Sequence, residues 1–187
     1  PLANLRLVQN FLASRSTPTV KPPYIIENDL FMVELDPSDR TLSIRDKVTG
    51  KVLHGLNRFV DSGDCGDEYN FSPPATDLLV DSTRLEKVTI QRGPVQQTMT
   101  AGLIMKVPAS LSSDRKARSK EMVEIPILTA VTLTNGVPRI DVHTCVDNRA
   151  KDHRLRVLSL VAGYFRFGDD GVDHAVLVRL PGVRAPP

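Results

Sequence analysis

The chain has 187 residues, with 24 Lys and Arg against 22 Asp and Glu, so its formal net charge is +2. This near balance gives no electrostatic footprint for a polyanion, and no apolar run approaches the roughly 20 residues that span a bilayer. With 41% hydrophobic and 25% charged residues, the composition also excludes disordered, collagen-like and coiled-coil classes. We therefore expect one globular domain without nucleic-acid or membrane partners.

The two cysteines, Cys65 and Cys145, lie far apart and form no CxxC or zinc-ribbon spacing. The favoured interpretation is two free thiols in a reducing compartment, which predicts a cytoplasmic protein; a disulfide across two strands is the alternative. The chain has no Trp, although sugar-binding surfaces commonly rely on aromatic faces.

Residues 1–16 are expected to form a short helix, because apolar side chains recur at three- and four-residue spacing. The three prolines of residues 17–23 (TPTVKPP) then favour an extended linker. A short helix and a Pro-rich linker over 1–23 are thus predicted.

From Tyr24 onward, apolar and polar residues alternate with a period of two, which is typical of strands with one buried face. Asn135-Gly136 between two such runs is a strong hairpin signal. We predict a mainly β fold, a large antiparallel β-sandwich over residues 24–160, with under about 20% helix. The expected strands fall within 30–45 (a hairpin), 51–53, 85–91, 95–107, 121–134, 139–147 and 153–160.

Residues 110–120 (SLSSDRKARSK) are polar and cationic. They lack the interleaved aromatic side chains of a nucleic-acid surface, so we expect a mobile hairpin tip.

Residues 61–74 (DSGDCGDEYNFSPP) form the densest cluster of acidic residues and glycines. An EF-hand is excluded, because Gly63 and Cys65 occupy the third and fifth ligand positions counted from Asp61. A solvated acidic loop, a calcium site of another type and the rim of a functional site remain open.

Asp141, His143 and Cys145 share one face of a predicted strand, and all three residue types bind zinc. A half-solvated outer face is the alternative. In residues 147–156 (DNRAKDHRLR), His153 stands beside Asp152. Adjacent strand residues point to opposite faces, so a charge-paired corner is expected there rather than a dyad.

Two segments, residues 26–74 and 137–158, contain long specific patterns: DKVTG, LNRFVDSGDCGDEYNFSPP and DNRAKDHRLRV. They resemble the C-terminal β-domain of glycoside hydrolase family 38, the α-mannosidases, especially its mannosylglycerate-hydrolase-like branch. The resemblance implies a galactose-mutarotase-like supersandwich, incomplete here, within a larger retaining glycosidase that acts on α-mannosides.

In this family, an α/β barrel carries the zinc and the nucleophilic aspartate, and a helical bundle follows. Nothing in this chain matches the barrel, so the resemblance implies a fragment that is inactive alone and has no catalytic residues, metal ligands or cofactor. Zinc is expected in the parent's barrel. The implied partners are the parent's barrel and helical domains and, through the parent, the α-mannoside.

The resemblance also implies that the β-domain sends a tyrosine-bearing loop toward the sugar. Residues 63–71 match this loop best, with Tyr69 as the candidate, and a phenol can both stack on a sugar face and hydrogen-bond a hydroxyl. A core or hairpin position for Tyr69 is the alternative. Asp64 and Asp67 are expected to fix this loop or to contact sugar hydroxyls.

Two other functions remain open. One is a stand-alone carbohydrate-binding module, against which the lack of Trp argues; the other is a small hydrolase that uses Asp64, Asp67 and Glu68. Residues 161–187 lack the family's usual continuation and are expected to be a diverged or truncated C-terminal segment.

Overall fold

The computed structural model describes residues 2–14, 19–67, 69–159 and 174–178. These residues contain one helix and eleven strands. The helix is α1 (Leu2–Ala13), and the strands are β1 (Tyr24–Glu27), β2 (Phe31–Leu35), β3 (Leu42–Asp46), β4 (Val52–Leu56), β5 (Arg58–Gly63), β6 (Arg84–Arg92), β7 (Gln96–Pro108), β8 (Met122–Thr134), β9 (Ile140–Val146), β10 (His153–Leu158) and β11 (His174–Val178).

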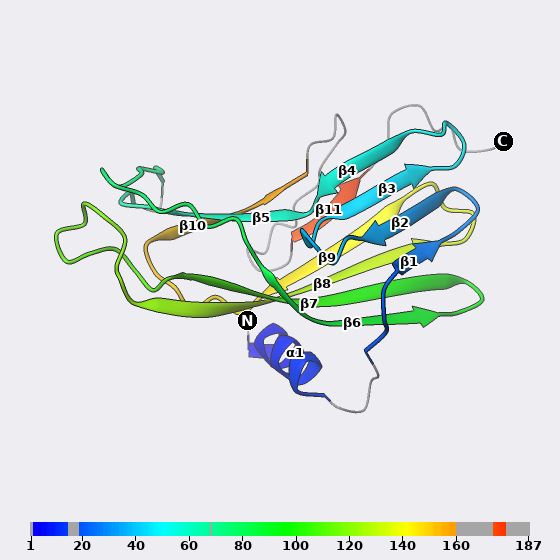
Figure 1. Ribbon diagram of the computed structural model, residues 1–187, viewed down its shortest axis with the longest axis horizontal. Coiled ribbons are helices and arrows are strands. Elements are labelled where there is room, and N and C mark those ends of the chain that lie inside the picture. Colours follow the sequence, from blue (N-terminus) through cyan, green and yellow to red (C-terminus); the bar gives the residue numbers. More distant parts are fainter. Residues whose placement is uncertain (1, 15–18, 68, 160–173, 179–187) are drawn as a thin grey trace.

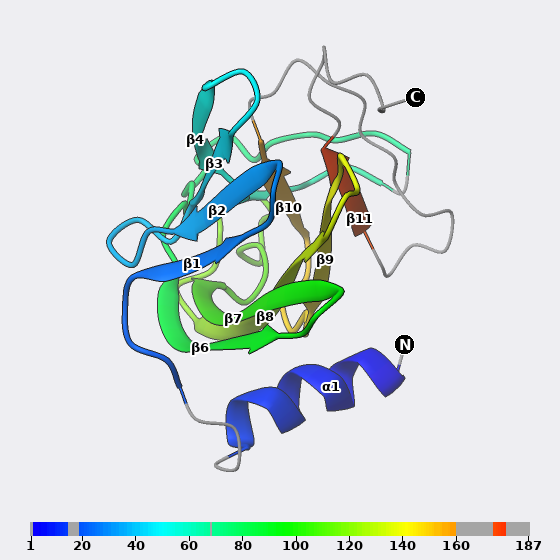
Figure 2. The same ribbon diagram turned by 90° about the vertical axis from the view of Figure 1, so that its right-hand side faces the viewer.

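The strands form three antiparallel sheets, with the orders β1-β2-β3-β4, β10-β5 and β11-β9-β8-β7-β6. The five-stranded sheet forms one layer, and the two smaller sheets lie across from it (Figure 1, Figure 2). This arrangement confirms the predicted β-rich antiparallel fold.

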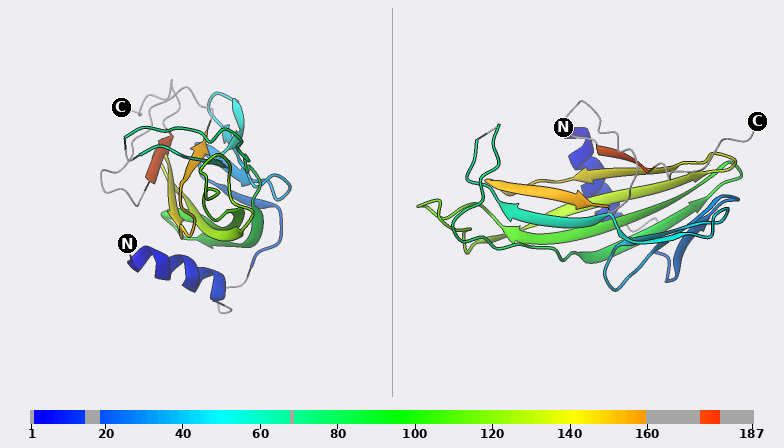
Figure 3. Two further views of the ribbon diagram at one scale, coloured as in Figure 1. Left: turned by 90° about the vertical axis from the view of Figure 1, so that its left-hand side faces the viewer. Right: turned by 90° about the horizontal axis from the view of Figure 1, so that it is seen from above.

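Local turn chemistry sets the registers of the hairpins. In the β8–β9 turn, Gly136 has a φ of 71°, a conformation that glycine adopts without steric cost. The long strands β7 and β8 pair over thirteen positions, from Gln96 opposite Thr134 to Pro108 opposite Met122. These two strands run the length of the molecule (Figure 3).

The apolar core lies between the layers in two clusters. The first packs the four-stranded sheet against β6 to β9, and its largest fully buried side chains are Phe31, Ile26, Leu35, Ile44, Met99, Leu133 and Ile140. The second packs β5 and β10 against the other halves of β7 and β8, around Phe59, Leu103, Met105, Ile125 and Ile127. The period-two alternation of the sequence therefore does bury one face of each long strand.

Helix α1 covers the outer face of the five-stranded sheet (Figure 2). Val8 packs there on Leu128 and Cys145. The helix is three residues shorter at its C-terminal end than the predicted span, and β1, β5 and β11 lie outside the predicted strand ranges. The predicted C-terminal segment lies outside the described residues except for β11.

Candidate functional site at the loop end

Three long connections between strands lie at one end of the sandwich, and we call this end the loop end. They are residues 64–83 between β5 and β6, residues 109–121 between β7 and β8, and residues 147–152 between β9 and β10. All three lie at the same end of the long strands (Figure 3).

A buried cluster of charges lies at the base of the loop end. The Asp61 side chain on β5 is 0% exposed, and the side chains of Arg118 and His153 are 2% and 5% exposed. Arg118 Nη1 lies 2.6 Å from Asp61 Oδ1, while its hydrogen bond goes to the backbone oxygen of Leu78 at 3.1 Å. His153 Nδ1 is hydrogen-bonded to Asp61 Oδ2. Three chain segments therefore converge on one carboxylate.

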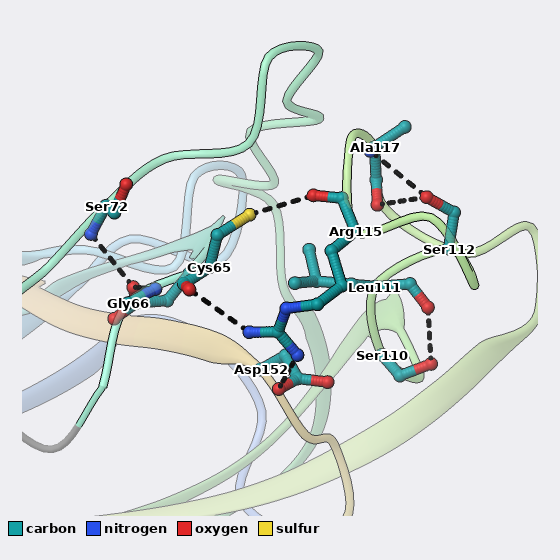
Figure 4. A network of polar contacts seen from close by, with 10 residues as sticks. Cys65, Gly66, Ser72, Ser110, Leu111, Ser112, Arg115, Ala117 and Asp152 are labelled. Carbon is teal, nitrogen blue, oxygen red and sulfur yellow. Dashed lines mark hydrogen bonds and ion pairs between the residues drawn. The ribbon is translucent and has the colours of Figure 1, made fainter.

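Arg115 fastens the connections to one another at the surface (Figure 4). Its Nη2 donates to the backbone oxygen of Cys65 at 3.1 Å, and its Nη1 lies 3.3 Å from Asp152 Oδ1. The Cys65 thiol donates to the backbone oxygen of Arg115 at 3.0 Å. Residues 110–120, predicted to be a mobile tip, thus supply one exposed and one buried arginine that bind other segments.

Asp64 and Asp67 shape the loop by binding its backbone. Asp64 Oδ1 accepts hydrogen bonds from the amides of Gly66 at 2.8 Å and Ser72 at 3.0 Å. Asp67 Oδ1 accepts from the amides of Tyr69 and Asn70, both at 2.9 Å. These two bonds hold the pKa of the Asp67 carboxyl below its ordinary value. The sequence predicted fixing of the loop or contact with sugar, and the structure shows bonds that fix it.

Aromatic rings of the loop face the solvent. The Tyr69 residue is 88% exposed, and Phe71 is also exposed. The guanidinium of Arg154 stacks over the Phe71 ring, with its Cζ 4.5 Å from the ring centroid. Tyr69 is therefore a surface residue available to a partner or ligand.

The metal sites and the dyad considered from the sequence can be checked in the described residues, whereas Glu68 of the small-hydrolase alternative lies outside them. No group of three or more His, Cys, Asp or Glu side chains among the described residues has the arrangement of a metal site. Asp141 pairs with Arg139 at 2.7 Å, and Cys145 is buried. His153 pairs with Asp61 and not with its neighbour Asp152, which pairs with Arg115. Of the three β9 candidates, His143 Nδ1 lies 3.7 Å from Cys145 Sγ, while Asp141 is engaged by Arg139. Asp152 and His153 form no dyad with each other, because each has another partner.

The Asp61–His153 contact joins the two sequence segments that carry the family patterns. The profile of the family described as "Glycosyl hydrolases family 38 C-terminal domain" matches residues 26–171, which is most of the chain. The chain belongs to this family. The match continues past Leu158, where the recognisable patterns end.

Individual proteins agree with this assignment. The chain is 31% identical over 149 residues to a "Putative mannosylglycerate hydrolase" of Halalkalibacterium halodurans, a match that covers 71% of this chain and 16% of the relative. Two solved structures from Enterococcus faecalis are similar, an alpha-mannosidase and a glycosyl hydrolase family 38 protein. Each is 25% identical with a TM-score of 0.69 over 83% of this chain, which spans only 19% and 20% of their lengths.

In the described part of the chain, no helix has the length and apolar character needed to cross a membrane.

Proposed function

We propose that this chain is a non-catalytic β-sandwich domain of an α-mannosidase-like retaining glycosidase. It braces the catalytic barrel of the parent and supplies a rim loop, residues 64–67 and 69–72, to the active site. The observation that carries the proposal is the exposed Tyr69 on a segment fastened by Asp64, Asp67 and Arg115, within a family 38 domain.

The bracing role is supported by apolar surface at the loop end. A pocket of about 340 Å³ is lined in part by exposed Leu78 and Met122, and Leu79, the next residue in the chain, is exposed as well. Its lining consists of Thr76, Asp77, Leu78, Ala117, Arg118, Ser119, Lys120 and Met122. Clustered apolar side chains on a surface are typical of sites that contact another protein surface.

In this proposal, zinc and the α-mannoside bind to the parent enzyme and not to this chain alone. The barrel would hold the metal and the nucleophile, and Tyr69 would stack on the sugar or bind one hydroxyl. Cys65 and Cys145 form no disulfide, which supports the proposed cytoplasmic location.

The first prediction is that the isolated chain has no α-mannosidase turnover, because the proposed catalytic groups belong to the barrel. The measurement is release of phenol from an aryl α-mannoside, with and without zinc. Zinc-dependent release above the buffer control that Asp67→Ala abolishes would contradict the proposal.

The exposed Tyr69 and Phe71 also favour a second candidate, a carbohydrate-binding module. Calorimetric titration of the isolated chain with mannosides separates the two functions. A module binds sugar alone, whereas a rim domain needs the barrel to complete the site.

The second prediction concerns Tyr69→Phe in the full-length parent. This change deletes one hydrogen bond to an uncharged group, which is worth about 0.5–1.5 kcal/mol, or about 2- to 13-fold in kcat/KM. Tyr69→Ala removes the ring as well and should lower kcat/KM further. Steady-state kinetics on an aryl α-mannoside measures both.

Tyr24→Phe is the matched control, because Tyr24 lies buried on β1 and should leave kcat/KM unchanged. Unchanged kinetics of Tyr69→Phe together with unfolding of Tyr69→Ala would make Tyr69 a structural residue and refute the rim role.

A further inference from the structure

The buried charges at the base of the loop end have no role in the function proposed so far. A buried carboxylate is costly unless cations and hydrogen-bond donors compensate it. Asp61 has two such partners, Arg118 and His153, which come from different connections. The two partners differ, because only the imidazole can change its charge near neutral pH.

Both ring nitrogens of His153 contact side-chain oxygens. Its Nδ1 faces the Asp61 carboxylate, and its Nε2 lies 3.0 Å from Asn148 Oδ1. The amide oxygen of Asn148 is identified by its other contact, since it accepts the backbone N–H of Ala150 at 3.0 Å. Both ring nitrogens therefore face acceptors, and only the imidazolium donates from both.

An imidazolium at position 153 adds a second positive charge to that of Arg118 beside the Asp61 carboxylate. A further carboxylate lies close by, since Asp77 Oδ1 and Arg118 Cγ are both 3.1 Å from the point where a Gly63 Cβ would stand. At the surface, Arg115 pairs with Asp152.

The cluster holds both ends of the segment that carries the rim loop. The Asp61 backbone pairs with Val80 through two hydrogen bonds of 2.7 and 2.9 Å. Arg118 binds the Leu78 carbonyl, and Asp77 Oδ1 accepts the Gly63 amide at 2.9 Å. The start of the segment at Gly63 is thus bound by the part-buried Asp77, and its end is bound at Leu78 by Arg118 and at Val80 by the backbone of Asp61.

We propose that His153 is held as an imidazolium between Asp61 and Asn148 and, with Arg118, is a positioning residue that fixes the base of the rim loop. The protonation of His153 and the anchoring of the rim loop can be measured in this chain without its parent. Only the effect of these contacts on catalysis rests on the proposed function.

The charge state is tested by nitrogen-15 NMR of the histidine rings of the intact chain at about pH 7.5, where an unconstrained histidine is mostly neutral. We expect proton-bound signals from both His153 nitrogens, assigned by their loss in His153→Gln. The exposed ring of His54, which contacts the Ser43 hydroxyl and no carboxylate, is the internal comparison. One unprotonated nitrogen in His153 would overturn the proposal.

The positioning role is tested by hydrogen exchange in His153→Gln, with His54→Gln as the matched control. A glutamine side chain does not donate to Asp61 and Asn148 from opposite sides. We expect the amides of Gly63 and Val80 to exchange more than about tenfold faster, while amides in the centre of β7 and β8 change little. Uniform acceleration, or none, would overturn the proposal.

A second variant covers the case in which His153→Gln does not fold. Arg118→Lys keeps the positive charge but loses the planar guanidinium that contacts both Asp61 and Leu78. It should accelerate exchange at Val80 with little effect on the His153 ring signals.

In the parent, both variants should lower kcat/KM for an aryl α-mannoside. If Tyr69→Phe has no effect on kcat/KM while the NMR results agree with the proposal, the proposed function is wrong and the role of the charge cluster is still supported.

Discussion

A single carboxylate organises the turn between β3 and β4. Asp46 Oδ1 accepts the backbone amides of Val48 at 2.8 Å and Thr49 at 3.1 Å, and Gly50 closes the turn with a φ of 73°. Burial raises the pKa of Asp46, but hydrogen bonds from the Thr49 hydroxyl and from the Thr49 and Val48 amides outweigh it. The net pKa lies below the ordinary value of 3.8, so folding favours the charged form.

The third prediction follows from the direction of this shift. A lowered folded pKa contributes stability that is complete above the unfolded value and is lost as the pH falls through the folded value. Asp46→Asn removes the charge and should lower the free energy of unfolding by about 0.5–1.5 kcal/mol at neutral pH. The difference from the wild type should shrink toward about pH 3.

Urea unfolding at both pH values measures the difference. Asp29→Asn, at an exposed position outside the strands, is the control and should change stability little at either pH. A deficit of Asp46→Asn that persists at the acidic pH would show that the charge is not what stabilises the turn.

Some residues of the loop end were predictable from the sequence, and others were not. Asp64 and Asp67 were predictable through the family resemblance, because both lie within one of the matching segments. The Asp61–His153 contact was missed, since its partners lie 92 positions apart and only the pairing of β5 with β10 brings them together. Arg118 was missed because neighbouring polar residues make residues 110–120 look fully solvated.

At the scale of elements, the packing of α1 on the sheet requires a glycine, Gly102, on the strand beneath it. A Cβ at Gly102 of β7 would stand 2.6 Å from Leu12 Cδ2 and 3.3 Å from Phe11 Cε1, so the helix packs directly on the strand backbone. Lys87 Nζ on β6 donates to the Ser14 carbonyl at 2.6 Å, just beyond the helix. The docking of α1 therefore combines close packing with a cation at the negative end of the helix dipole.

The fourth prediction is that Gly102→Ala destabilises the docked helix. Overpacking of this kind costs about 1–3 kcal/mol, and here the flexible end of Leu12 absorbs part of it. Proteolytic cleavage within residues 2–14 should become faster, as followed by mass spectrometry.

The double variant Leu12→Ala/Gly102→Ala restores the space and should recover part of the protection. Gly93→Ala, in the β6–β7 turn, is the matched control. If Gly102→Ala leaves cleavage of α1 unchanged, close contact with the strand is not what holds the helix.

The hairpins at this scale were predictable, because alternation and turn residues are local signals. The strand β5 was not, since its last residues read as part of the acidic loop that follows. Pairing with β10 and burial of Phe59 against the second core cluster override this local polarity.

At the scale of the whole molecule, the loop end differs from the rest of the surface in how its exposed apolar side chains are grouped. At the loop end, Leu78 and Leu79 are exposed on one connection beside the pocket. Elsewhere, exposed Val48 and Val95 stand singly on turns, which is ordinary for a folded surface. The family patterns predicted that the chain is part of a larger enzyme, but no local pattern indicated which surface meets the rest.

The fifth prediction is that Leu78→Ser/Leu79→Ser reduces self-association of the isolated chain at high concentration, because it removes clustered apolar surface. The melting temperature should change little, since both side chains are exposed. Analytical ultracentrifugation and thermal unfolding measure the two effects.

Val48→Ser/Val95→Ser removes a similar apolar area from isolated positions and is the control. In the full-length parent, only the Leu78/Leu79 variant should make the boundary of this domain more accessible to protease. Equal behaviour of the two double variants would remove the argument for a contact surface at the loop end.

Cys65 and Cys145 form no disulfide, and they lie in two different parts of the fold, the rim-loop connection and the contact of α1 with the sheet. Cys145 is buried with Val8 and Leu128 beneath α1, and Cys65 is part-exposed in the connection that carries Tyr69. An alkylating reagent therefore reaches Cys145 only when the helix lifts from the sheet, whereas its reaction with Cys65 follows the motion of the loop. A time course of labelling, resolved by peptide mass, would record both movements in the native protein without an added probe.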